Sequence, residues 1–211
     1  MRARFSTTSR SRGSLVFAST SFSALARLAL PLGWRVTLID DRSEFTREAR
    51  LPETVAIQVG ELPALLAAAQ PDAASAVVIV TRGHRSDQDA LRAALETPAG
   101  YIGMIGSPSK VRNIFRALLK AGVPTEQVAR VHAPIGLDLG AETPDEIALS
   151  IAAELLAWRR EGSGAPLRDR EGILNRLLDA REKSEQSEQS EAEAPEETGA
   201  AEGELTQIAP A

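Results

Sequence analysis

Short runs of apolar residues alternate with amphipathic segments along most of the chain. The runs are rich in Val, Ile and Leu without polar alternation, which is typical of strands that are buried on both faces of a parallel sheet. The segments between them repeat their apolar residues at helical spacing. Strands are therefore predicted over residues 14–18, 34–39, 55–59, 76–81 and 101–105, and helices over 22–32, 61–70, 87–95 and 108–121. This order predicts a doubly wound α/β fold with a mainly parallel sheet, whose ligands bind at the carboxyl ends of the strands.

A longer helix is predicted after these units. Thr143 is followed by Pro144 and, three residues after the Thr, by Glu146. This is the pattern of an N-cap Thr, a Pro at the first helical position and a capping box. Apolar residues then recur at helical spacing as far as Trp158. A further amphipathic segment, residues 173–180, predicts a final helix or a contact with a partner.

Both ends of the chain differ in composition from the middle. Residues 1–13 are rich in Arg and Ser, and residues 182–211 contain nine Glu, one Lys and no aromatic residue. Neither segment can bury enough apolar surface to fold. We therefore expect a disordered basic arm (1–13) and a disordered acidic tail (182–211) on either side of one domain (14–181). An organelle-targeting segment is the alternative interpretation of the arm.

The composition excludes several kinds of site and partner. The chain has no cysteine, so its own residues cannot form a disulfide, a zinc-thiolate site, an iron–sulfur cluster or a thiol nucleophile. No apolar run approaches the about 18 residues of a membrane helix. The segment between the two charged ends is nearly neutral, which is not the profile of a nucleic-acid-binding protein. We expect a soluble, cytoplasmic protein that binds neither nucleic acid nor membrane.

The first two strand-to-helix turns hold candidate binding residues. The first turn contains Ser19 and Ser21 but no glycine, so it lacks the sequence that lets a backbone approach a pyrophosphate. Helix capping is the alternative role of these serines. Asp40 and Asp41 follow the second strand, where a carboxylate can accept hydrogen bonds from a ribose or a similar diol. An ordinary strand-ending Asp is the alternative.

The turn after the fourth strand contains Arg82, Gly83 and His84. Positive charge on both sides of the histidine favours a neutral imidazole that can donate or accept a hydrogen bond. The turn borders the crevice where the strand order is expected to reverse, which favours a binding role. The alternative is a solvated loop with Ser86 or Asp87 as the helix cap.

The turn after the fifth strand contains Gly106 and Ser107, and Lys110 follows in the first turn of the next helix. A cation at that place is unfavourable for the helix dipole. An anion held by the backbone amides, Ser107 and Lys110 would explain it. The alternative is a capped helix with an exposed lysine.

The last candidate segment is the loop over residues 132–142, which has neither helical nor strand periodicity. It contains His132 and Asp138 together with two glycines. Two histidines in loops of this kind are compatible with a metal pair, but no third ligand is evident, and no metal site is predicted.

Five of these stretches, in this order, resemble the C-terminal Rossmann-like domain of the xanthine dehydrogenase accessory factor (XdhC/CoxI) family. The resemblance covers residues 14–160. It is carried by Gly33–Val36, Asp40–Arg42, Thr81–His84, Tyr101–Ser107 and Val131–Ile147.

The resemblance implies a maturation factor for molybdenum hydroxylases such as xanthine or carbon monoxide dehydrogenase. Such a protein binds the molybdenum cofactor (molybdopterin) and delivers it to the hydroxylase apoenzyme, so it is a binding protein rather than a catalyst, with no catalytic residue. Its ligand is an anionic pterin that carries a phosphate. The residues expected to hold it are Ser19, Ser21, Asp40, Asp41, Arg82, Gly83, His84, Gly106, Ser107, Lys110, His132 and Asp138.

The chain departs from the family pattern in three ways. Ala18–Ser21 stands where the family usually has a glycine-rich turn, and Pro108-Ser109 stands where it often has a basic pair. The family's cysteine-containing amino-terminal domain is not in the sequence. A separately encoded domain of that type and a cysteine desulfurase are therefore further expected partners, and a homodimer stays open. Two alternative functions remain: an NAD(P)-dependent oxidoreductase, which the glycine-free first turn argues against, and a diverged interaction module that binds no cofactor.

Overall fold

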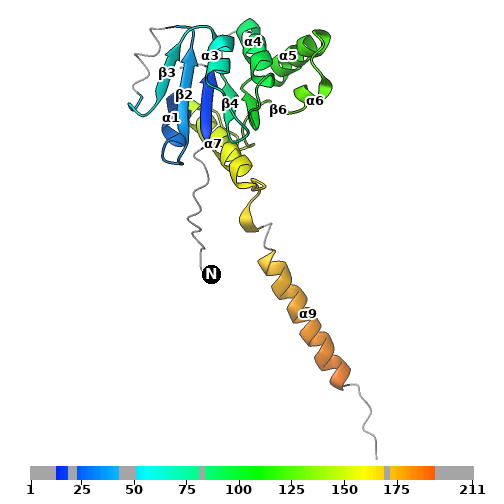
Figure 1. The fold of residues 1–211 in the computed structure, drawn as a ribbon. Coiled ribbons are helices and arrows are strands. Elements are labelled where there is room, and N and C mark those ends of the chain that lie inside the picture. The colour runs from blue at the N-terminus through cyan, green and yellow to red at the C-terminus, as the bar shows by residue number, and fades with distance from the viewer. Residues whose placement is uncertain (1–12, 19–22, 43–50, 81–83, 169–171, 193–211) are drawn as a thin grey trace, which may run out of the picture. The chain divides into compact units, whose positions relative to one another are not determined.

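The computed structural model describes residues 13–18, 23–42, 51–80, 84–168 and 172–192. The chain divides into two compact units, Met1–Gly164 and Ala165–Ala211. In the described part of the first unit, six strands form one sheet with the order β3-β2-β1-β4-β5-β6 (Figure 1), and every pairing is parallel. The strands are β1 (Ser14–Ala18), β2 (Arg35–Asp40), β3 (Ala56–Val59), β4 (Ala76–Ile79), β5 (Tyr101–Met104) and β6 (Val131–His132). The chain changes direction across the sheet between β3 and β4, so the predicted doubly wound α/β fold is confirmed.

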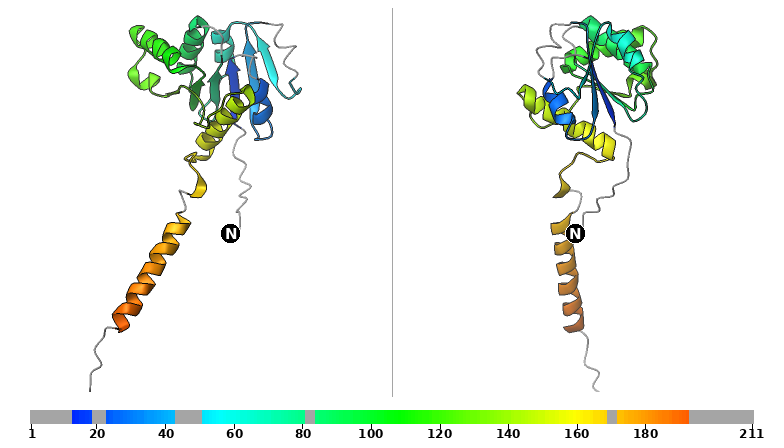
Figure 2. Two further views of the ribbon diagram at one scale, coloured as in Figure 1. Left: turned by 180° about the vertical axis from the view of Figure 1, so that it is seen from behind. Right: turned by 60° about the vertical axis from the view of Figure 1, so that its left-hand side comes forward.

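Helices cover both faces of this sheet, as the view along its edge shows (Figure 2, right). Along β1, Leu15 and Phe17 pack toward α1 (Ser23–Ala29) and α7 (Pro144–Arg160), whereas Val16 packs toward the opposite face. That opposite face is covered by α3 (Leu62–Ala68), α4 (His84–Leu95) and α5 (Pro108–Lys120). Side chains on both faces of the central strands are buried, which is why these strands are apolar without alternation.

The capping box predicted for α7 is present. The Thr143 hydroxyl accepts a hydrogen bond from the Glu146 N–H at 3.3 Å, and the Glu146 carboxylate accepts one from the Thr143 N–H at 2.8 Å. The same carboxylate oxygen accepts a hydrogen bond from the Glu142 N–H at 2.9 Å. The start of α7 is therefore fixed by its own sequence.

Two short elements and several helix boundaries differ from the prediction; α1, for example, ends at Ala29 and not at residue 32. The strand β6 and the helix α6 (Thr125–Val128) were not predicted, and β6 places His132 in the sheet rather than in a loop. Helix α4 begins at His84, three residues earlier than expected. In the second unit, α9 (Ile173–Ala192) is longer than the predicted 173–180.

Helix α9 includes residues 182–192, which were assigned to the acidic tail in the sequence analysis. Six of the eleven residues in this stretch are Glu or Gln, which lose little side-chain freedom in a helix. Arg181 and Glu185, one turn apart, form an ion pair at 2.7 Å between Nε and Oε1. The rest of the predicted tail, and the basic arm as far as residue 12, lie outside the described residues. No helix in the described ranges is both long enough and apolar enough to cross a lipid bilayer.

Candidate functional site

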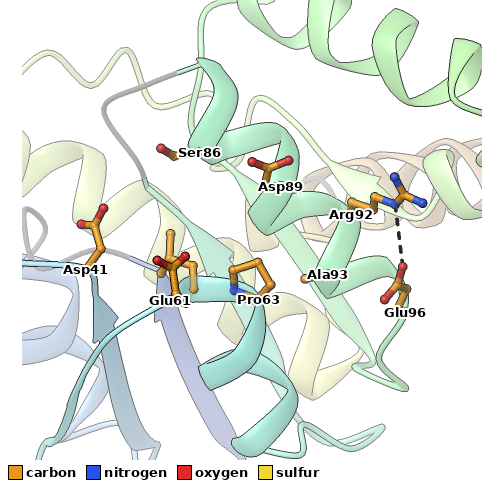
Figure 3. Close-up of a pocket in the computed structure, with 9 residues that line it drawn as sticks. Asp41, Glu61, Pro63, Ser86, Asp89, Arg92, Ala93 and Glu96 are labelled. Atoms are coloured by element: carbon orange, nitrogen blue, oxygen red, sulfur yellow. Dashed lines mark ion pairs between the residues drawn. The ribbon is translucent and has the colours of Figure 1, made fainter.

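A cavity of about 320 Å³ lies at the carboxyl ends of β2 and β3, between α3 and α4. This is the edge of a doubly wound sheet at which ligands bind. Figure 3 shows Asp41 and Glu61 on the side of the strand ends, with Ser86 and Asp89 opposite them on α4. The cavity is lined by Asp41, Glu61, Leu62, Pro63, Ser86, Asp89, Arg92, Ala93 and Glu96.

The lining of the cavity is acidic on one side and apolar on another. Three carboxylates come from three places: Asp41 follows β2, Glu61 precedes α3 and Asp89 is in α4. Glu61 is the N-cap residue of α3, but its side chain makes no capping hydrogen bond. Arg92 is paired with Glu96 at 3.8 Å between Nε and Oε1, as the dashed line in Figure 3 marks. The cavity therefore offers hydrogen-bond acceptors and negative charge.

The two neighbouring predicted residues Asp40 and Asp41 have different roles in the structure. Asp40 is buried, and its carboxylate accepts hydrogen bonds from the Arg42 backbone N–H at 3.0 Å and from the Arg42 Nε at 3.2 Å. Its backbone carbonyl accepts a hydrogen bond from the Gly60 N–H at 3.0 Å. Asp40 thus holds the end of β2 in place, and the side chain of Asp41, 61% exposed, lines the cavity.

Lys110 has a buried carboxylate as its partner within the protein, and its predicted contact with a bound anion stays a prediction. Its ammonium group forms an ion pair with the carboxylate of Asp87, whose side chain is fully buried. The alternative interpretation of this turn made Ser86 or Asp87 the helix cap; because α4 begins at His84, Asp87 lies inside the first turn instead. Ser107 caps α5 as expected, since its hydroxyl accepts the Lys110 N–H at 3.3 Å.

Gly106 lies against the aliphatic part of the Lys110 side chain. A Cβ atom at Gly106 would meet the Lys110 Cδ at 3.2 Å, so another residue here would push the lysine side chain aside. The three predicted residues Gly106, Ser107 and Lys110 are therefore together at the carboxyl end of β5, with the lysine bound to α4. Four predicted residues, Ser19, Ser21, Arg82 and Gly83, lie outside the described residues, and so does the side chain of His84.

His132 lies on the α7 side of the sheet, away from the cavity. Its Nδ1 is 2.8 Å from Oε1 of Glu154 in α7, and its ring stacks on Tyr101 with 4.3 Å between the ring centroids. The other oxygen of Glu154 accepts the Gly136 N–H at 2.5 Å, so this one carboxylate fastens the loop after β6 to α7. Burial, and then the charge of Glu154, raises the pKa of the Tyr101 hydroxyl well above its usual range.

Asp138, the remaining predicted residue, is exposed on the same loop. Within the described part of the chain, no group of three or more His, Cys, Asp or Glu side chains is arranged to hold a metal ion. The histidine and the loop aspartate thus form no common site with the cavity.

Sequence reasoning missed Glu61, Ser86 and Asp89. Glu61 could have been predicted, because Gly60-Glu61 follows the third predicted strand and forms a strand-to-helix turn like the others. The spacing of Ser86, Asp89, Ala93 and Glu96 places them on one face of a helix, but nothing in the sequence shows that this face turns toward β2.

An all-parallel sheet in this order, covered by helices on both faces, defines a Rossmann-type domain, and its cavity lies at the carboxyl edge. Residues 14–155 match the family described as the XdhC Rossmann domain, and the chain belongs to that family. The resemblance stated from the sequence motifs is confirmed.

Relatives and one solved structure support this assignment. The chain is 34% identical over 142 residues to the uncharacterized protein YqeB of Escherichia coli K12, a match that covers 67% of this chain and 26% of YqeB. It is 28% identical over 136 residues to a probable xanthine dehydrogenase subunit of Bacillus subtilis, covering 64% of this chain and 39% of that protein. A crystal structure titled as a xanthine dehydrogenase from Bacillus halodurans superposes with a TM-score of 0.62 and 26% identity, over 71% of this chain and 43% of that one. The chain thus spans less than half of the length of each of these relatives.

Proposed function

We propose that this chain is the ligand-binding Rossmann domain of an accessory factor for a molybdenum hydroxylase of the xanthine dehydrogenase type. In this function it binds the molybdenum cofactor at the carboxyl edge of its sheet and delivers it to the hydroxylase apoenzyme. The observation that supports the proposal most directly is the cavity at the ends of β2 and β3 in a chain of the XdhC family. The names of two relatives, which refer to xanthine dehydrogenase, support the class of the partner.

The chemistry of the described residues favours binding over catalysis. The carboxylates of the cavity can accept hydrogen bonds from the amino and ring N–H groups of a pterin, and its apolar side can contact the face of a ring. The sequence contains no thiol, so a sulfur atom for the cofactor would come from a partner such as a cysteine desulfurase. We accordingly assign this chain the holding and transfer of the cofactor.

The experiment is a retention and transfer assay on the full chain. Molybdenum cofactor is released anaerobically from a donor molybdoenzyme, mixed with the chain and passed through a gel-filtration column. The chain with its bound cofactor is then added to a hydroxylase apoenzyme from a host that cannot make the cofactor. We expect cofactor to elute with the chain, and hydroxylase activity to appear faster than with free cofactor. Retention no greater than on bovine albumin would contradict the proposal.

The same preparation tests the competing oxidoreductase function. NADH and NADPH are titrated into the chain and their fluorescence is followed. Saturable binding of either at micromolar concentration, together with no retention of the cofactor, would favour a nicotinamide-dependent enzyme. We expect no saturation, because the first turn has no glycine to admit a pyrophosphate.

A further inference from the structure

The cavity between α3 and α4 is lined in a way that selects one part of a ligand. Four of its side chains are carboxylates, and its one guanidinium, on Arg92, is paired with Glu96. A phosphate placed there would meet more negative than positive charge, and repulsion between like charges at short range is unfavourable. The cavity is therefore unsuited to the anionic end of a nucleotide or of a pterin cofactor.

Hydrogen-bond donors suit this lining. An aminopyrimidine ring, as in a pterin or a guanine, carries an amino N–H and a ring N–H side by side. Two parallel donors of that kind match the two oxygens of one carboxylate. Asp41, Glu61 and Asp89 reach the cavity from different elements, so a ring between them can meet a carboxylate from more than one side (Figure 3).

Two of the three carboxylates are available for such a ligand within the described residues. Glu61 makes no capping hydrogen bond although it occupies the N-cap position of α3. Asp41 is 3.5 Å from Arg42, but that guanidinium lies closer to the buried Asp40, at 3.2 Å. Asp41 thus keeps a longer ion pair with Arg42, and its side chain, 61% exposed, also lines the cavity.

The size and the apolar wall of the cavity indicate a flat ring rather than a small cation. Leu62, Pro63 and Ala93 form part of the lining and can contact the face of a ring. The volume of about 320 Å³ is near the lower end of the roughly 300–1,000 Å³ found for small-molecule sites, so it holds one ring system and not a complete cofactor.

From these observations we infer that Asp41, Glu61 and Asp89 recognise the N–H donor edge of an aminopyrimidine heterocycle, and that the phosphate of the ligand stays outside this cavity. The inference rests on the proposed function and deepens it, because it names the part of the pterin that the cavity receives. Glu61 and Asp89 were not predicted as site residues, and they determine specificity in this interpretation.

The test uses 6-hydroxymethylpterin, which has the donor edge but no phosphate, with guanosine and inorganic phosphate as the other probes. Each is titrated by calorimetry into the full chain and into the variants Glu61→Gln and Asp89→Asn. Asp145→Asn is the matched control, because it removes an exposed carboxylate from α7, on the other face of the sheet. Thermal unfolding of every variant checks that it is folded.

We expect the pterin to bind, and each cavity variant to weaken its binding by about tenfold or more, since a hydrogen bond to a charged acceptor has that effect. The control variant should bind as the unmodified chain does, and inorganic phosphate should neither bind nor compete. Guanosine that competes with the pterin would support recognition of the shared edge, and a pterin that binds alone would assign the cavity to the pterin.

Two results would overturn the inference. One is pterin binding that is unchanged in both cavity variants; the other is displacement of the pterin by inorganic phosphate. These failures can be separated from failure of the proposed function. If the chain retains and delivers the whole cofactor but both cavity variants do so equally well, only the inference falls. If free pterin binds and the cofactor is not retained, the proposed delivery falls.

Discussion

Replacing Lys110 with Met removes the ionic partner of a fully buried carboxylate, that of Asp87. Removing one partner of a fully buried ion pair costs up to about 3–5 kcal/mol, because the other charge stays buried without that partner. The Lys110 side chain is 20% exposed, so solvent already screens part of the interaction, and we expect a loss of about 2–4 kcal/mol in the free energy of unfolding. A domain with a total stability of about 5–15 kcal/mol would be measurably weakened.

Urea denaturation followed by tryptophan fluorescence measures this loss. Both tryptophans of the chain, Trp34 and Trp158, lie in the first unit and stack on each other, so their emission reports unfolding of that unit. With a slope of about 2 kcal/mol per molar urea, in the middle of the usual range, the midpoint should fall by about 1–2 M. Lys120→Met is the matched control, since this exposed lysine ends the same helix, and its effect should stay within about 0.5 kcal/mol.

A double-mutant cycle decides whether the pair itself is responsible. Asp87→Leu combined with Lys110→Met removes both charges, and we expect the double variant to be more stable than Lys110→Met alone. If Lys110→Met costs less than about 0.5 kcal/mol, or if the two single losses simply add, the ion pair is not what holds α4 against α5.

Further predictions concern other parts of the first unit. Tyr101 is the single tyrosine of the chain, and burial raises the pKa of its hydroxyl, so tyrosinate absorbance should appear only on unfolding. Because the unfolded chain loses this proton more easily, the free energy of unfolding should fall as the pH rises above 10. Tyr101→Phe should abolish that fall. Thr143→Ala should destabilise the chain by about 1 kcal/mol in urea. Hydrogen bonds from the Thr143 and Glu142 backbone lower the pKa of Glu146, so its contribution should be present above pH 4.5 and lost in thermal unfolding scans as the pH falls through the lowered pKa. Gly100→Ala should cost about 2–3 kcal/mol in the same urea assay, because its Cβ would lie 2.1 Å from the backbone oxygen of Ala73, which cannot rotate away.

Most of the fold could be predicted from the pattern of apolar residues within each element, and the elements that were missed are too short to show such a pattern. Strands such as β4, with four buried apolar residues in succession, can be predicted because burial on both faces leaves no polar position. The strand β6 has two residues and α6 has four, and neither is long enough to show a period. The length of α9 was underestimated because residues 182–192 contain few apolar residues, and composition alone does not separate an exposed helix from a disordered tail.

The candidate site was harder to predict, because its contacts join distant parts of the sequence. Asp41 could be found, since it ends a strand at the carboxyl edge. The partner of Lys110 could not be found, because Asp87 is 23 positions away and meets it only when α4 and α5 pack side by side. Likewise, Glu154 is 22 positions from His132, and only the packing of α7 on the sheet removes that histidine from the carboxyl edge.

Recognition of the ligand by a cation and recognition by the acidic cavity predict different effects of salt on cofactor binding. If an unpaired Lys110 attracted the anionic ligand, added salt would weaken binding, as it does for contacts between exposed cations and phosphates. In the structure Lys110 is neutralised by Asp87, and the charges around the cavity are mainly carboxylates that repel an anion. Screening of that repulsion should strengthen retention of the whole cofactor or leave it unchanged as sodium chloride is raised at constant pH, while binding of the uncharged 6-hydroxymethylpterin should not change. A loss of retention with rising salt would show that a cation governs binding, and the acidic cavity would then not be the place where the ligand is recognised.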